Sequence, residues 1–173
     1  MKLAGKRVAC LVEEDFEDLE LWVPVMRLRE EGAIVTLVGS GRLEGFRGKY
    51  GIPAKPEVNA DKVRSENFDA LIIPGGWAPD KLRRYPVITS LVRIMYLEGK
   101  IIGTICHGGW VLISAGIVEG HKATSTVAIK DDLINAGAEW VDESALRDGN
   151  LVWGRVVEDI PNYCRLLVEA LAE

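Results

Sequence analysis

Short, nearly unbroken apolar runs recur along this sequence, and they limit the folds it can adopt. Three such runs lie at residues 33–38, 70–73 and 101–105, and a β-branched run lies at residues 6–12. A strand with one face in water alternates apolar and polar residues, so these runs indicate strands buried on both faces. Such strands are typical of a mostly parallel sheet covered by helices on both sides.

Segments with helical spacing separate these runs. Residues 20–31 and 86–98 carry their apolar side chains on one face, and the second segment begins at Pro86 and stops before Gly99. Residues 158–171 repeat the same periodicity at the end of the chain. Shorter helices are predicted at residues 110–115 and 127–135, a loop with hairpin-like excursions at 39–51, and a hairpin turn at Asp148-Gly149.

The composition fits one domain with a single core. The chain has 173 residues, of which 48% are hydrophobic and 27% charged, values that exclude disorder and predict one α/β sandwich over residues 1–173. A net charge of −5 gives no basic surface for nucleic acid or anionic membranes. The apolar runs are too short to cross a bilayer and the N-terminus lacks a signal-peptide pattern, so we expect a cytoplasmic protein.

Cys106 follows the fourth apolar run and is the most informative residue of the sequence. Thr104 and Gly108, two residues before and after it, are small, as a sharp strand-to-helix turn around a nucleophile requires. Backbone N–H groups and a helix N-terminus beside the sulfur favour the thiolate, so a lowered pKa and high reactivity are expected. The alternative is a buried structural cysteine, the role expected for Cys10 and Cys164.

Other candidate groups should meet Cys106 at the carboxyl edge of the sheet. His107 is either a catalytic base or a side chain that caps the turn, and its N–H could form an oxyanion hole with that of Gly76. One carboxyl from the acidic cluster at residues 13–20 could be desolvated in this crevice and bond the thiolate as a neutral acid. The three cysteines show no metal-ligand spacing, so neither a metal nor a cofactor is predicted.

Several stretches, in collinear order, resemble the ThiJ/PfpI family and within it the PfpI-type intracellular protease branch. They are residues 16–21, Pro74-Gly75-Gly76, and residues 105–108, 112–116, 129–132 and 134–142. The resemblance implies a flavodoxin-like three-layer sandwich with a nucleophile elbow. It also implies Cys106 as the nucleophile, Glu17 as the carboxyl facing its sulfur, and His107 as their partner.

The same resemblance implies that the site is completed in a homodimer or hexamer. A carboxylate of a neighbouring subunit would reach the histidine, and in this sequence that position is Asp80, one methylene shorter than the usual glutamate. Gly109 replaces a proline, and Thr126 stands where the protease branch usually has tyrosine. We expect both departures to touch the pocket.

Three functions remain open from the sequence. The main expectation is a cysteine hydrolase acting on peptides, because the matching stretches belong to that branch. The first alternative is a glutathione-independent glyoxalase or a protein deglycase, in which the thiolate adds to a small aldehyde and a nearby acid moves a proton. The second is a redox-sensing or chaperone stress protein, which requires only a reactive, exposed thiol.

Overall fold

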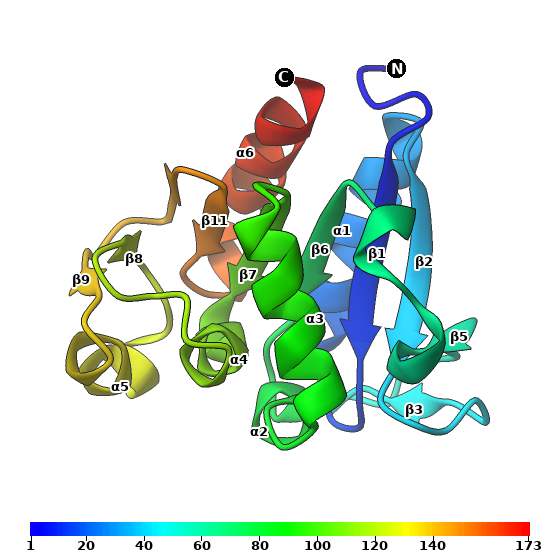
Figure 1. Ribbon diagram of the computed structural model, residues 1–173, viewed down its shortest axis with the longest axis horizontal. Coiled ribbons are helices and arrows are strands. Elements are labelled where there is room, and N and C mark those ends of the chain that lie inside the picture. The colour runs from blue at the N-terminus through cyan, green and yellow to red at the C-terminus, as the bar shows by residue number, and fades with distance from the viewer.

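A seven-stranded sheet forms the centre of the computed structural model, which describes residues 1–173 (Figure 1). Its strands, in spatial order, are β10 (Ala145–Asp148), β11 (Leu151–Gly154), β7 (Ile101–Ile105), β6 (Ala70–Ile73), β1 (Arg7–Val12), β2 (Ile34–Gly39) and β5 (Val58–Asn59). Neighbouring strands pair in parallel, except that β10 and β11 form an antiparallel hairpin at one edge. The predicted mostly parallel sheet is confirmed.

Burial explains why the central strands are so apolar. Every residue of β6 and β7 is buried, and in β1 only Arg7 is exposed. A strand in the middle of a covered sheet presents both faces to apolar layers, so it has no position at which a polar side chain can reach water. The unbroken runs of the sequence are the direct consequence.

Helices cover both faces of the sheet and complete a three-layer sandwich (Figure 1). Helices α1 (Asp18–Glu30) and α6 (Ile160–Ala172) contact each other on one face, while α3 (Pro86–Leu97) lies on the other. The buried side chains of α3 are Ile88, Leu91, Val92 and Met95, the apolar face of the predicted helix. The flavodoxin-like α/β fold is therefore as predicted. None of the helices combines the length and apolar character needed to cross a bilayer.

Shorter elements connect the strands and helices of the sandwich. They are the helices α2 (Ala78–Leu82), α4 (Gly109–Ser114) and α5 (Lys130–Asn135), the strand pairs β3 (Phe46–Arg47) with β4 (Pro53–Ala54) and β8 (Lys122–Ala123) with β9 (Glu139–Trp140), and 3-10 turns at Ala60–Lys62, Ser65–Asn67, Cys106–Gly108, Val127–Ile129 and Val157–Asp159. The helix predicted at residues 127–135 is divided between a 3-10 turn and α5, since Thr126 caps the turn separately.

Gly103 in β7 allows α6 to approach the sheet closely. A Cβ atom at this position would lie 2.6 Å from Leu167 Cδ2 and 2.7 Å from Tyr163 Oη, both side chains of α6. These distances are well below ordinary contact, so any larger residue must displace the side chains with which α6 packs on the sheet.

We expect Gly103→Ala to lower the free energy of unfolding by about 1–3 kcal/mol, the usual cost of overpacking a core. Gly41→Ala is the matched control, because its Cβ atom would enter open space and the glycine has an ordinary φ. Urea denaturation of both variants measures the effect. Equal stability of Gly103→Ala and Gly41→Ala would contradict the packing described for α6.

Candidate active site

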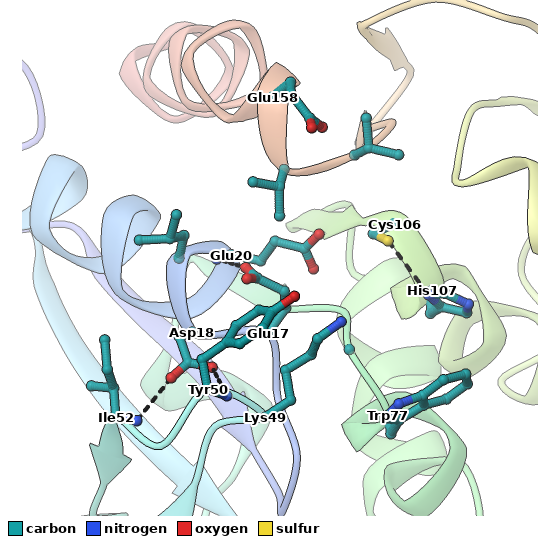
Figure 2. Close-up of a pocket in the computed structure, with 14 residues that line it drawn as sticks. Glu17, Asp18, Glu20, Lys49, Tyr50, Ile52, Trp77, Cys106, His107 and Glu158 are labelled. Carbon is teal, nitrogen blue, oxygen red and sulfur yellow. Dashed lines mark hydrogen bonds between the residues drawn. The ribbon is translucent and has the colours of Figure 1, made fainter.

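Three segments meet in a pocket at the carboxyl edge of the sheet (Figure 2). The first turn of α1 follows β1, a Gly-Gly turn follows β6, and Cys106 follows β7 directly. The pocket has a volume of about 570 Å³. Its lining comprises Glu17, Asp18, Leu19, Glu20, Lys49, Tyr50, Ile52, Gly76, Trp77, Cys106, His107, Val156, Val157 and Glu158.

The backbone at Cys106 has the strained geometry of a nucleophile elbow. Its φ of 59° lies in the left-handed region, which costs a non-glycine residue about 1–2 kcal/mol. A Cβ atom at Gly108 would collide with Thr104 Oγ1 and lie 3.0 Å from the Ile73 carbonyl oxygen. The small flanking residue is therefore required by the tight turn, as the sequence predicted, and the turn aims the sulfur into the pocket.

The carboxyl against the sulfur is that of Glu20, and the expectation that Glu17 takes this place is wrong. Glu20 is 2% exposed, its side chain interacts with the Cys106 thiol, and its Oε2 accepts the Gly75 N–H at 2.8 Å. A Cβ atom at Gly75 would collide with Glu20 Oε2 and lie 2.9 Å from Cys106 Cβ. Only glycine at this position lets the acid and the thiol come together.

Glu17 instead caps helix α1. Its Oε2 accepts the Glu20 N–H at 2.8 Å and so satisfies an N–H group that has no partner within the helix. The residue three positions later then points toward Cys106. One helical turn takes 3.6 residues, so the residue at which α1 begins decides which carboxyl faces the sulfur. The sequence pattern does not predict that residue.

Burial and mutual repulsion make Glu20 and Cys106 a coupled acid pair. Burial, together with the smaller effect of the Glu17 charge, raises the pKa of Glu20 to about 8. Burial also raises the pKa of Cys106, and an ionised Glu20 adds to this shift. The predicted lowering of the Cys106 pKa is therefore wrong, because burial of the thiol and the acid beside it outweigh the N–H of His107. With this raised pKa the carboxyl carries its proton at pH 7 and can donate it beside the Cys106 thiol.

His107 lies close enough to exchange a proton with the Cys106 thiol. Its Nδ1 is 3.4 Å from Cys106 Sγ, and the ring is held between Trp77 and Trp110 at centroid distances of 5.3 and 5.1 Å. Burial lowers the pKa of His107, and the charge of Lys49 lowers it further. A neutral imidazole at pH 7 can accept the thiol proton, so the geometry suits a base.

Two backbone N–H groups are placed to stabilise an anion near the sulfur. The His107 N–H interacts with Cys106 and lowers its pKa. Gly76 has φ of 75°, and its neighbours Gly75 and Trp77 form the bridge to residues 15–17, which leaves the Gly76 N–H without an acceptor in the chain. Gly76 and His107 are therefore suitably placed for the oxyanion hole predicted from the sequence, and that role stays a prediction.

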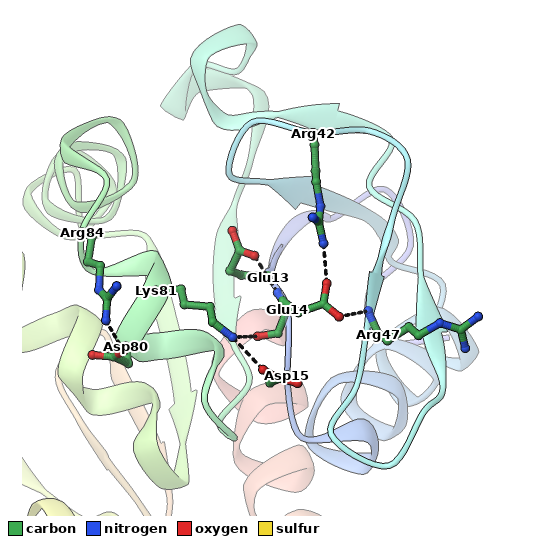
Figure 3. A network of polar contacts seen from close by, with 8 residues as sticks. All are labelled: Glu13, Glu14, Asp15, Arg42, Arg47, Asp80, Lys81 and Arg84. Carbon is green, nitrogen blue, oxygen red and sulfur yellow. Dashed lines mark hydrogen bonds and ion pairs between the residues drawn. The ribbon is translucent and has the colours of Figure 1, made fainter.

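Asp80 lies outside this pocket, on α2 (Figure 3). Its Oδ2 pairs with Arg84 at 2.6 Å, whereas the adjacent Lys81 pairs with Asp15 at 2.7 Å. Its proposed contribution to a neighbouring subunit stays a prediction. Gly109 and Thr126 do not line the pocket either, so the expectation that these departures touch it is wrong for the pocket within one chain.

The sequence reasoning missed the side of the pocket formed by the β3–β4 hairpin. Lys49, Tyr50 and Ile52 come from its turn, and Glu158 comes from the turn before α6. No periodicity or spacing connects these residues to Cys106. No three His, Cys, Asp or Glu side chains gather as a metal site anywhere in the chain.

Comparison with known proteins gives a family for this architecture. A model of the DJ-1/PfpI family matches residues 6–170. The chain belongs to the DJ-1/PfpI family. It is 45% identical over 165 residues to Deglycase PH1704 of Pyrococcus horikoshii, covering 95% of this chain and 99% of that protein. General stress protein 18 of Bacillus subtilis is 37% identical over 164 residues, covering 93% of this chain and 95% of that protein.

A solved structure shares the family fold as part of a larger chain. It is a two-domain protein from Anabaena variabilis with DJ-1/ThiJ/PfpI-like and ferritin-like domains, and it matches at a TM-score of 0.94 with 36% identity. The match covers 96% of this chain and 48% of that one. The DJ-1/PfpI fold is thus the part that the two proteins share.

We expect Glu20→Gln to remove a pH-dependent instability from this DJ-1/PfpI protein. The folded state holds the Glu20 proton up to about pH 8 while the unfolded chain releases it near 4.5, so folding stability falls as pH rises between these values. The loss is on the order of 3 kcal/mol between pH 4.5 and 7. Gln keeps the acceptor for Gly75 without the charge.

Urea denaturation at pH 4.5 and at pH 8 provides the measurement. The variant should gain stability relative to wild type as the pH is raised, and Glu66→Gln, an exposed site outside the pocket, should not. If the stability difference between Glu20→Gln and wild type is the same at both pH values, Glu20 is not the buried acid described above.

Proposed function

We propose that the protein is a deglycase that acts on adducts of reactive dicarbonyl compounds, and that it converts a free dicarbonyl such as methylglyoxal by the same chemistry. The observation that carries this proposal is the protonated carboxyl of Glu20 beside the elbow thiol of Cys106. The similarity to relatives named deglycases, at 41–45% identity, supports it. The peptidase expected from the sequence has less support, since no such name accompanies these relatives.

The first step joins sulfur to the carbonyl carbon. The Cys106 thiol gives its proton to neutral His107 while its sulfur attacks the aldehyde, and the carbonyl oxygen takes the proton of Glu20. The product is a hemithioacetal with an intact second carbonyl. The N–H groups of Gly76 and His107 would stabilise the negative charge that develops on oxygen during the attack.

The second step moves hydrogen between two carbons. The Glu20 carboxylate, formed in the first step, removes the proton from the carbon bonded to sulfur, and the imidazolium of His107 supplies a proton to the neighbouring carbon. The hydroxyl proton of the hemithioacetal passes to the oxygen of the second carbonyl. The hemithioacetal thereby becomes a thioester of an α-hydroxy acid. Water then cleaves the carbon–sulfur bond, which releases the α-hydroxy acid and restores the thiol, so that no external oxidant or reductant is consumed.

A side-by-side assay tests the proposal. Wild type should consume methylglyoxal and reverse methylglyoxal adducts of N-acetylarginine, and Cys106→Ser should lose at least about 100-fold of both activities, as expected for loss of a nucleophile. Cys164→Ser is the control, because Cys164 is a core residue of α6. Cleavage of a fluorogenic peptide that depends on Cys106, with both adduct and methylglyoxal untouched, would favour the peptidase instead.

We also propose that the active form is a homo-oligomer in which Asp80 orients His107 of a neighbouring subunit. The exposed position of Asp80 on α2, outside its own pocket, supports this arrangement. Inactive Cys106→Ser and Asp80→Asn variants should recover activity when mixed under conditions of subunit exchange, because mixed oligomers contain intact sites. Full activity of a monomeric species would contradict it.

A further inference from the structure

The pocket around Cys106 contains one cation among several acids. Glu17, Asp18 and Glu20 enter from α1, Glu158 from the turn before α6, and Lys49 from the β3–β4 hairpin opposite them (Figure 2). The pocket also contains the imidazole of His107, whose pKa is lowered by burial, so that it is neutral at pH 7. The Lys49 ammonium lies 5.1 Å from the centre of the Tyr50 ring and forms no ion pair with a carboxylate. Its charge is therefore available to a ligand.

A buried carboxylate fixes the turn that carries Lys49. Asp18, which is 2% exposed, accepts the N–H groups of Tyr50 at 3.0 Å and Ile52 at 2.8 Å. The Lys49 N–H donates to the Phe16 carbonyl at 2.9 Å, which ties the turn to the segment before α1. A buried acid needs such donors, and Asp18 finds both of them in this one turn.

The turn lies so close to Asp18 that only glycine fits at position 48. A Cβ atom at Gly48, the residue before Lys49, would collide with the Asp18 carboxylate. The Gly48 N–H also donates to the Ile52 carbonyl at 2.9 Å, so the turn is closed on itself. The hairpin therefore presents Lys49 to the pocket from a fixed backbone.

The charge of Lys49 acts on all three reacting groups. It lowers the pKa of Glu20, of Cys106 and of His107, so it favours an anionic acid pair and a neutral imidazole. The Coulomb interaction of a single positive charge with neighbouring groups is strongest where water is largely excluded. Among the residues that line the pocket, no other cationic side chain can provide this effect.

We propose that Lys49 is a catalytic residue that stabilises the negative charge shared by Cys106 and Glu20 and binds the carboxylate of the α-hydroxy acid product. Asp18 is its positioning residue, acting through the turn at residues 48–52. The part that concerns the product rests on the proposed function, whereas the part that concerns the thiol does not. This role of Lys49 predicts that the protein prefers substrates that become anionic in the pocket.

Titration of the thiol tests the first part without any substrate. The rate of Cys106 alkylation by iodoacetamide is measured against pH in the intact protein, with peptide mapping. Lys49→Met should move the midpoint up by about one pH unit, the effect of removing a nearby charge. Lys49→Arg should keep the wild-type midpoint, and so should Lys55→Met, a change of an exposed lysine outside this pocket.

The same titration of Asp18→Asn tests whether Asp18 positions Lys49. Loss of a carboxylate near the pocket would, by charge alone, lower the midpoint, whereas displacement of Lys49 raises it. We expect a rise, smaller than that in Lys49→Met, with circular dichroism unchanged. A fall in the midpoint would overturn the role of Asp18.

Kinetics test the part that depends on the proposed function. Lys49→Met should reduce kcat/KM for methylglyoxal about 10-fold or more and weaken inhibition by lactate, and Lys49→Arg should restore both. A wild type inactive on methylglyoxal, together with the expected shift in thiol titration, overturns the proposed function and supports Lys49 as the cation. An unchanged midpoint of thiol titration in Lys49→Met overturns the proposed role of Lys49, whatever the activity of the variant.

Discussion

The contact between a buried carboxyl and a strained thiol determines much of this site. Glu20 and Cys106 come from different elements, and Gly75 lies between them with no side chain. Their burial makes the two groups compete for negative charge, so the pair holds its protons at pH 7. A nucleophile with a proton donor beside it suits addition to a carbonyl, where the oxygen must be protonated as sulfur attacks.

The turn of the β3–β4 hairpin supplies the opposite wall of the pocket and its positive charge. Asp18 is adjacent in the chain to the helix cap Glu17 and holds that turn by two N–H groups. The first turn of α1 thus has three acids with three different tasks, since one caps the helix, one anchors the hairpin and one faces the sulfur. Their order along a helix, with 3.6 residues per turn, separates these directions.

The family resemblance and the physical chemistry of the site answer different questions. The family fixes the fold, yet a thiol, a neutral histidine and free N–H groups would serve a hydrolase and a deglycase equally well. The protonated Glu20 and the names of the relatives favour deglycation. The pocket of about 570 Å³ has room for a small adduct and a charged side chain against its acidic and basic walls.

The sequence by itself determined the sheet, the helices and the elbow. Unbroken apolar runs require a covered parallel sheet, and small residues around Cys106 require a tight turn, because both patterns reflect local geometry. The tertiary structure decided which acid meets the sulfur. The start of α1 selects Glu20 over Glu17, and Lys49 reaches the pocket from a hairpin that no spacing connects to Cys106. The shift of the thiol pKa likewise depends on burial and on a neighbour distant in sequence, which a local pattern does not contain.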